Sequence, residues 1–258
     1  MDNLVTIENL NVRFALEDYT VHAVRDVSFS IARGQSMGLV GESGCGKSVT
    51  AYSIMRLISP PGYIDSGNIL FENTSLLDLD DESMRKIRGN KIAMIFQEPM
   101  TSLNPVFTIG YQVEEVLQLH RGMDKKESRE YAADMLNQVG VPSPRRRLNS
   151  YPHELSGGLR QRVMIAMALA TDPAMLIADE PTTALDVTIQ AQILDLLLSL
   201  QSSRGMSLLL ISHDLGIVAN TADHIAIMYA GEIVEHAAVK SIFEKQLHPY
   251  TLGLFNAI

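Results

Sequence analysis

One eight-residue segment combines glycines, a lysine and a serine in a pattern suited to phosphate chemistry. Residues Gly41–Ser48 match G-x-x-x-x-G-K-S and follow a short apolar run at 36–40. Glycines let successive backbone N–H groups point at phosphate oxygens, and a helix that begins at Lys47 adds partial positive charge. Lys47 supplies a charge for the β- and γ-phosphates, and the Ser48 hydroxyl is suited to Mg²⁺. The segment therefore predicts a phosphate-binding loop between a strand and a helix.

The alternative for this segment is a glycine-rich turn that binds nothing, and the full match in its strand-and-helix context favours the phosphate loop. The residues expected to contact the ligand are Gly41, Ser43, Gly44, Cys45, Gly46, Lys47, Ser48 and Val49. The thiol of Cys45 occupies a free position of the motif and is expected to be incidental. Such loops occur in kinases, GTPases, helicases and transport ATPases, so the motif indicates a ligand but no single function.

Two acidic residues follow another apolar run, Met175–Ala178, at the end of a predicted strand. Open parallel sheets place their ligands at that end of their strands. Two adjacent carboxylates are costly to bury without a cation, and Mg²⁺ would supply one. Asp179 is then expected to orient the metal through its water shell, and Glu180 to act as general base on the attacking water. Two acids that cap a solvated loop are the alternative.

Apolar patterning predicts an α/β fold with a mostly parallel sheet. Segments 5–14 and 27–31 alternate like half-buried antiparallel strands, whereas 92–96, 174–178 and 207–211 are continuously apolar, like strands buried on both faces. Helices are expected at 47–57, 80–88, 124–139, 159–170 and 187–201. Asp124 and Glu127 form the pattern of a capping box at the third of these helices.

Composition excludes several classes of protein. The chain has 258 residues, 46% of them hydrophobic, and a formal net charge of −9, which disfavours nucleic acid as a partner. Cys45 is the single cysteine, so no internal disulfide forms, and a reducing cytosolic compartment is expected. We find no secretory leader and no apolar run long enough to span a bilayer, so work at a membrane would need a partner.

The segment Leu155–Gln161 resembles the signature of ATP-binding cassette (ABC) ATPases, and it precedes the acidic pair as in that family. The resemblance implies ATP and Mg²⁺ as cofactors. It also implies a P-loop NTPase core with an N-terminal antiparallel β layer and an inserted helical subdomain. On this basis residues 1–98 and 160–258 form the core, and residues 99–159 form the helical subdomain that ends in the signature.

The resemblance also assigns roles to residues outside the two motifs. Ser156, Gly157, Gly158 and Gln161 would contact ATP held by an opposite subunit; because residue 159 is leucine, no capping-box partner occupies the Ser156 hydroxyl, which is expected to be free for a phosphate. The other matched positions are Phe14 (stacking on adenine), Gln97 (Mg²⁺ and the water), Asp186 in the loop 184–186 (the dimer interface) and His213 (the γ-phosphate). Alternatives are a core position for Phe14 and an ordinary polar strand end for His213. The predicted catalytic residues are Lys47, Gln97, Glu180 and His213, and the predicted metal-binding residues are Ser48, Gln97 and Asp179.

Two further stretches, Gln97–Pro105 and His248–Thr251, resemble the peptide and nickel import subfamily. They imply an ATP-hydrolysing subunit of a dipeptide or oligopeptide importer, peripheral on the cytoplasmic face of the plasma membrane. Its partners would be a second ATPase subunit, identical or not, two transmembrane permease subunits and, indirectly, an extracytoplasmic solute-binding protein. Alternatives are an importer of nickel or a metal chelate, an exporter subunit, and a soluble non-transport ATPase, which typically carries two cassettes or a long coiled coil.

Overall fold

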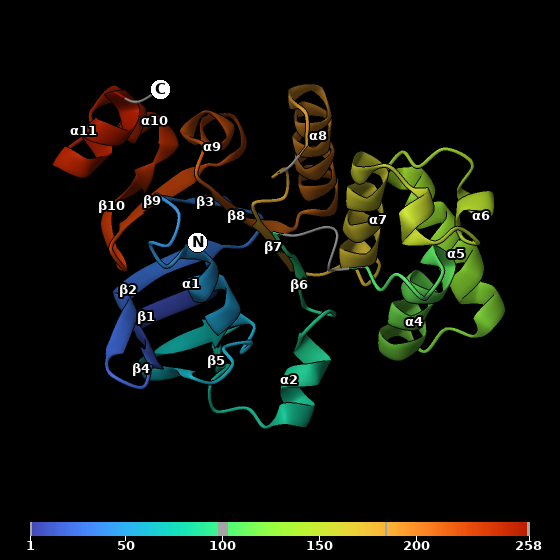
Figure 1. Ribbon diagram of the computed structural model, residues 1–258, viewed down its shortest axis with the longest axis horizontal. Coiled ribbons are helices and arrows are strands. Elements are labelled where there is room, and N and C mark those ends of the chain that lie inside the picture. Colours follow the sequence, from blue (N-terminus) through green and yellow to red (C-terminus); the bar gives the residue numbers. More distant parts are fainter. Residues whose placement is uncertain (1, 98–102, 184, 257–258) are drawn as a thin grey trace. The chain divides into compact units, whose positions relative to one another are not determined.

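The computed structural model describes residues 2–97, 103–183 and 185–256, shown as ribbons in Figure 1. Helices and strands are interspersed along the chain, which confirms the predicted α/β class. The chain divides into two compact units. Unit 1 comprises Met1–Met84 and Ser207–Ile258, and unit 2 comprises Arg85–Met206. This division follows packing within the chain, and the predicted boundaries of a helical subdomain at 99–159 stay a prediction.

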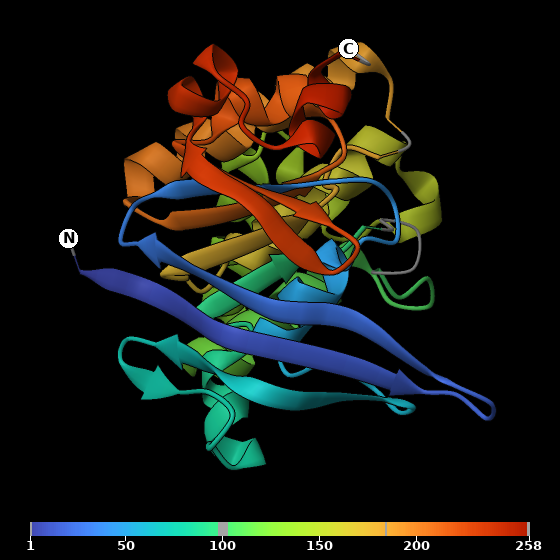
Figure 2. The ribbon, with the colours of Figure 1, turned by 90° about the vertical axis from the view of Figure 1, so that its left-hand side faces the viewer.

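An antiparallel sheet begins unit 1, as the alternating N-terminal segments predict. Its strand order is β2-β1-β4-β5, and Figure 2 shows β1 between β2 and β4. The strands are β1 Asn3–Ala15, β2 Thr20–Ala32, β4 Gly62–Phe71 and β5 Thr74–Ser75. A register shift between Ile7 and Leu10 of β1 changes the alternation by one residue and keeps both side chains buried.

A second sheet in unit 1 carries the strands that precede the phosphate-loop segment and His213. In it, β3 pairs in parallel with β8 and with β9, and β10 pairs antiparallel with β9. The strands are β3 Ser36–Val40, β8 Ser207–Ser212, β9 His224–Tyr229 and β10 Glu232–Ala238. The helices of this unit include α1 Lys47–Ile54, α9 Leu215–Thr221, α10 Val239–Glu244 and α11 Pro249–Asn256. Every residue of β3 and β8 is buried, as their continuous apolar runs predict.

Unit 2 contains the parallel pair β6 and β7 together with several helices. Its elements include β6 Ile92–Ile95, β7 Met175–Asp179, α4 Ile109–Arg121, α5 Lys125–Gln138, α6 Pro144–Arg147, α7 Gly157–Leu169 and α8 Val187–Arg204. The prediction that Phe96 continues the buried strand is wrong. The ladder ends where Ile95 faces Ala178, and the Phe96 side chain beyond it is 37% exposed.

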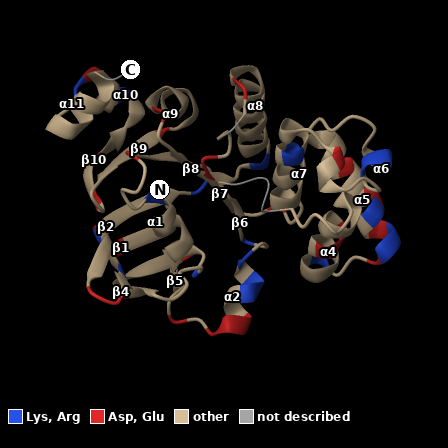
Figure 3. Cartoon of the chain, viewed as in Figure 1, with Lys and Arg blue, Asp and Glu red and all other residues tan. Residues whose placement is uncertain are grey.

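Local charge patterns fix several helix ends. In α2 (Asp81–Ile87) acidic residues occupy the first turn and basic residues the last, which complements the helix dipole (Figure 3). The predicted capping box of α5 is confirmed, because the Asp124 carboxylate accepts the Lys126 and Glu127 N–H groups and Glu127 accepts the Asp124 N–H. Sequence patterns of three or four residues therefore determine where these helices begin.

Among residues 2–97, 103–183 and 185–256, no helix combines the length and the apolar character that crossing a bilayer requires. The same residues contain no cluster of three or more His, Cys, Asp or Glu side chains arranged to hold a metal ion.

Candidate active site

The phosphate-loop segment connects β3 to α1 in unit 1, and two of its glycines cannot carry a side chain. A Cβ on Gly41 would lie 2.1 Å from the Met228 carbonyl oxygen, and one on Gly46 would lie 2.5 Å from the Ala23 carbonyl oxygen. Gly46 also has a φ of 110°, in the left-handed region that favours glycine. The glycines of the motif are thus required by close backbone packing as well as by the turn itself.

Lys47 begins α1 and directs its ammonium group back into this loop. Its side chain is buried, and Nζ donates to the carbonyl oxygens of Gly41 and Glu42, each at 2.8 Å. The Cys45 sulfur lies 3.7 Å from the same nitrogen. These partners are neutral, since backbone carbonyls carry no charge and burial raises the pKa of the Cys45 thiol. They satisfy the hydrogen-bonding capacity of the ammonium group without neutralising its charge, so the loop favours an anion.

The start of α1 offers backbone donors beside this charge. Its N-cap residue is Gly46, and no side chain caps the helix there. The first N–H groups of a helix have no partner within the helix, and they attract anions together with the helix dipole. The side chain of Ser48 is half-buried in the first turn. The loop therefore has the features that a polyphosphate requires: a glycine backbone, a buried cation and a helix end without a capping side chain.

His213 lies at the same edge of the sheet as the phosphate loop. Val40, the last residue of β3, pairs with Ser212, the last residue of the parallel strand β8. The segments that follow the two strands therefore leave the sheet side by side, and His213 is exposed there. The structure thus brings together within unit 1 two motifs that lie far apart in the sequence.

In unit 2, the acidic pair lies where β7 ends. Asp179 is fully buried, and carboxylates at that depth favour a cationic partner. Glu180 follows with a φ of 45°, in the left-handed region that non-glycine residues adopt uncommonly. The Gln97 side-chain nitrogen donates to Glu180 Oε2 at 3.1 Å, and the Thr183 hydroxyl donates to the same oxygen at 2.8 Å. One carboxylate oxygen of Glu180 is thus held by two donors.

The contact between Thr183 and Glu180 was not foreseen from the sequence. A hydroxyl three residues after an acid is common, and only the tight turn after β7 brings the two side chains together. The resemblance assigns Gln97 to the metal and the water, and the structure places it beside Glu180 because it follows the strand β6 that pairs in parallel with β7. The residues Glu98–Ser102 of the same predicted segment, and Ala184, lie outside the described residues.

The signature segment in unit 2 forms the N-terminus of α7, with one correction. Ser156 is exposed, but its hydroxyl oxygen accepts the Leu159 N–H at 3.4 Å, so the expectation of a hydroxyl without an intrahelical role is wrong. Ser156 caps α7 even though leucine at position 159 has no side-chain acceptor for the Ser156 N–H. Gly157 is exposed beside it, and a Cβ on Gly158 would lie 2.9 Å from the Ile189 side chain of α8. This helix end is accessible, and its second glycine is needed for packing.

Three further predicted residues have structural contacts of their own. Asp186 caps α8 by accepting the Ile189 N–H at 2.9 Å. The Phe14 ring is half-buried in β1 and lies over Gly62, whose Cβ would be 2.6 Å from the ring. Gln161 is fully buried in α7, and neither atom of its amide has a hydrogen-bond partner in the described structure. The predicted roles of these residues in nucleotide binding stay predictions.

A match to a protein family model supports the interpretation of these motifs. Residues 24–183 match the model described as "ABC transporter". This stretch includes the phosphate loop, Gln97, the signature segment and the acidic pair.

Individual relatives are similar over nearly the whole chain. The dipeptide transport ATP-binding protein DppD of Bacillus subtilis is 52% identical over 259 residues, which is 100% of this chain and 77% of the relative. The oligopeptide transport ATP-binding protein OppD of the same organism is 52% identical over 97% of this chain and 70% of its own length. Among solved structures, the dimeric ATP-binding cassette MJ0796 in a post-hydrolysis state with ADP and Pi aligns with a TM-score of 0.81, at 31% identity over 91% of this chain and 98% of that one.

The packing of the loop glycines predicts a difference between two substitutions. Gly44 and Gly46 both have positive φ values, but a Cβ on Gly44 meets nothing within 4 Å. Gly44→Ala should therefore lower the free energy of unfolding by about 1 kcal/mol, the strain of a left-handed alanine. Gly46→Ala adds a backbone clash and should lower it by at least about 1 kcal/mol more. Denaturant unfolding measures both variants, and equal effects would contradict the packing argument.

Proposed function

Because this chain belongs to the ABC transporter family, we propose that it is the ATP-hydrolysing subunit of an importer whose cargo is a dipeptide or an oligopeptide. The buried Lys47 charge in its glycine loop carries the proposal for ATP, because it offers an anion site of the kind a polyphosphate fills. The cargo is proposed from the relatives, whose names specify dipeptide and oligopeptide transport. The subfamily motifs at 97–105 and 248–251 agree with this cargo.

The proposed nucleotide contacts follow from the loop. The β- and γ-phosphates would lie against the N–H groups at the start of α1, with Lys47 Nζ keeping its hydrogen bond to the Gly41 carbonyl and turning another N–H to phosphate oxygens. His213 would contact the γ-phosphate, and Phe14 would stack on the adenine. Mg²⁺ would be held by Ser48 and Gln97, and through water by Asp179, and would neutralise charge on the β- and γ-phosphate oxygens. A metal that takes phosphate oxygens as ligands agrees with the lack of a protein-only cluster among the described residues.

Glu180 is the proposed general base. Its carboxylate would accept a proton from a water molecule as the water oxygen attacks the γ-phosphorus. The bond from that phosphorus to the oxygen bridging it to the β-phosphate then breaks, and ADP and inorganic phosphate are formed. Gln97 and Thr183 both donate to Oε2 of Glu180, and these two contacts would hold the carboxylate in place for the water. The protein's contribution is chiefly positioning and charge neutralisation.

A second copy or a homologous subunit would complete the site. The exposed start of α7, with Ser156 and Gly157, would bind the γ-phosphate of ATP held by the other subunit. A group supplied in trans to a related phosphate loop contributes roughly 10³–10⁵ in rate. Closure and opening of this dimer would then drive two permease subunits. The chain would lie peripherally on the cytoplasmic face of the membrane, with residues 99–159 as the helical subdomain that meets the permease.

The base assignment predicts the effect of Glu180→Gln. This variant should keep the affinity for ATP and lose at least about 100-fold in kcat, because an amide cannot accept the proton. Phosphate release and the binding of a fluorescent ATP analogue measure the two properties. The matched control is Glu130→Gln, an exposed glutamate of α5 in the same unit, which should turn over at the parent rate. Turnover by Glu180→Gln at the parent rate would show that another group is the base.

The cargo assignment predicts a transport phenotype. Deletion of the gene for this subunit should abolish ATP-dependent uptake of a labelled dipeptide or oligopeptide, and restoring the parent gene should recover it. A Glu180→Gln gene should not recover it, because the permease depends on hydrolysis. Uptake of ⁶³Ni²⁺ in the same strains separates the alternatives. Loss of nickel uptake with intact peptide uptake would contradict a peptide importer.

A further inference from the structure

The segment His248–Thr251 leads into α11, and β10 anchors the start of this helix. The Glu235 carboxylate of β10 accepts the N–H groups of Leu247 at 3.0 Å and His248 at 3.2 Å. Burial alone would raise the pKa of Glu235, but the nearby Thr251 hydroxyl and the hydrogen bonds from the Leu247 and His248 N–H groups outweigh it and lower the pKa. The carboxylate is therefore ionised at neutral pH and fixes the beginning of α11 against the sheet.

The anchored start of α11 places the side chain of Tyr250 against the sheet. The Tyr250 N–H donates to His248 Nδ1 at 3.2 Å, which shapes the first turn of α11. The Tyr250 ring packs on the ring of Tyr229 at the end of β9, with ring centroids 4.4 Å apart. Two independent contacts thus fix the direction of the Tyr250 side chain.

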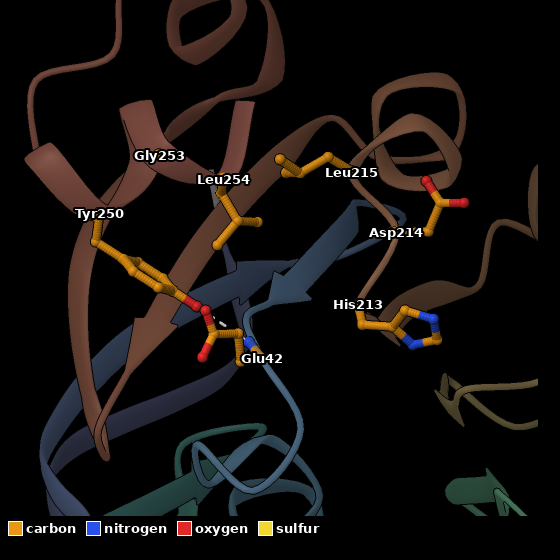
Figure 4. A pocket seen from close by; sticks show the side chains of 7 residues that line it. All are labelled: Glu42, His213, Asp214, Leu215, Tyr250, Gly253 and Leu254. Carbon is orange, nitrogen blue, oxygen red and sulfur yellow. Dashed lines mark hydrogen bonds between the residues drawn. The ribbon is translucent and has the colours of Figure 1, made fainter. Parts of the chain in front are cut away.

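The Tyr250 hydroxyl reaches the phosphate loop. The Glu42 N–H donates to this hydroxyl at 3.1 Å, as the dashed line in Figure 4 shows. The contact lies at the rim of a cavity of about 520 Å³ that Leu215, Leu254 and His213 also line. Burial raises the pKa of Tyr250, so the hydroxyl is neutral and keeps its own proton. The phosphate loop therefore borders this cavity, and the hydrogen bond from the Glu42 N–H to the Tyr250 hydroxyl connects the loop to α11.

One peptide group connects this contact to Lys47. The N–H of Glu42 belongs to the same planar peptide as the carbonyl of Gly41, and that carbonyl accepts from Lys47 Nζ at 2.8 Å. Because the peptide is planar, a partner that fixes the N–H direction also fixes the carbonyl direction. Hydrogen bonds in such a chain polarise one another. The Tyr250 hydroxyl therefore acts on the position of the Lys47 ammonium through a single peptide group.

We propose that Tyr250 is a positioning residue, which holds the Gly41–Glu42 peptide so that the phosphate loop keeps its nucleotide-binding shape. A loop that populates this shape less often binds nucleotide in proportion more weakly. This inference rests on the proposed function, since it concerns the ATP site. It assigns the C-terminal helix a role in that site through a side chain that makes no contact with the nucleotide.

The test is Tyr250→Phe, which removes only the hydroxyl and keeps the ring on Tyr229. Because one neutral hydrogen bond contributes about 0.5–1.5 kcal/mol, the Kd for a fluorescent ATP analogue should rise about twofold to twelvefold. The kcat at saturating ATP should change less than twofold, because bound nucleotide itself orders the loop. Amide hydrogen exchange of the unliganded protein should become faster in the peptide that contains Glu42.

The matched control is Tyr229→Phe, which removes a hydroxyl from the other ring of this tilted pair. It should keep the parent Kd and the parent exchange at Glu42, and both variants should keep the parent Tm within about 2 °C. Parent-like Kd and exchange in Tyr250→Phe would overturn the inference while the parent protein still binds ATP. Equal changes in both variants would also overturn it, since they would indicate general loosening of α11. Failure of the parent protein to bind the analogue would instead refute the proposed function.

Discussion

The central constraint on the site is the buried positive charge of Lys47, which hydrogen bonds within its own loop hold in place but do not neutralise. The Lys47 ammonium donates to two backbone carbonyls, and those partners leave its charge in place. The loop achieves this geometry because Gly41 and Gly46 allow the backbone to approach Met228 and Ala23 more closely than any side chain permits. Strand β3 and helix α1 provide the two fixed ends. An anion that completes this charge balance is the natural ligand of such a site.

Unit 2 supplies acidic groups, in contrast to the cation in the phosphate loop of unit 1. Its acidic pair follows β7, and Glu180 has a left-handed backbone conformation with one oxygen tied to Gln97 and Thr183. The same unit presents the exposed N-terminus of α7. Phosphoryl transfer to water needs a cationic cradle, a base that is oriented before the reaction, and a further donor for the γ-phosphate. In the proposed mechanism Lys47 would be the first of these, Glu180 the second and the N-terminus of α7 of another subunit the third, and the family model that the chain matches is described as ABC transporter.

Contacts set by short patterns could be predicted from the sequence. The phosphate loop, the buried strand before it, the helix after it and the Asp124 capping box each depend on residues within about eight positions of one another, and the structure contains all of them. The role of Gln97 near the metal came from the family resemblance, and the parallel pairing of β6 with β7 is the physical reason that it lies beside Glu180. The end of β6 before Phe96 could not be predicted, since apolar character alone does not reveal where a ladder stops.

Contacts that depend on tertiary placement could not be predicted. Tyr250 meets Glu42 across 208 positions of sequence, and only the docking of α11 on β9 and β10 makes that hydrogen bond possible. The cap from Ser156 was missed for a different reason. Leucine at position 159 has no side-chain acceptor that could complete a capping box. Its backbone N–H still needs an acceptor, and the Ser156 hydroxyl oxygen provides it.

Calorimetric titration of the purified protein with a non-hydrolysable ATP analogue and Mg²⁺ tests the central claim most directly. The account predicts saturable binding with one nucleotide per chain, displaced by ADP and weakened at least about tenfold in Lys47→Ala, because that variant removes the buried charge. The absence of binding to the parent protein, or equal affinity in Lys47→Ala, would contradict the assignment of this loop as the nucleotide site.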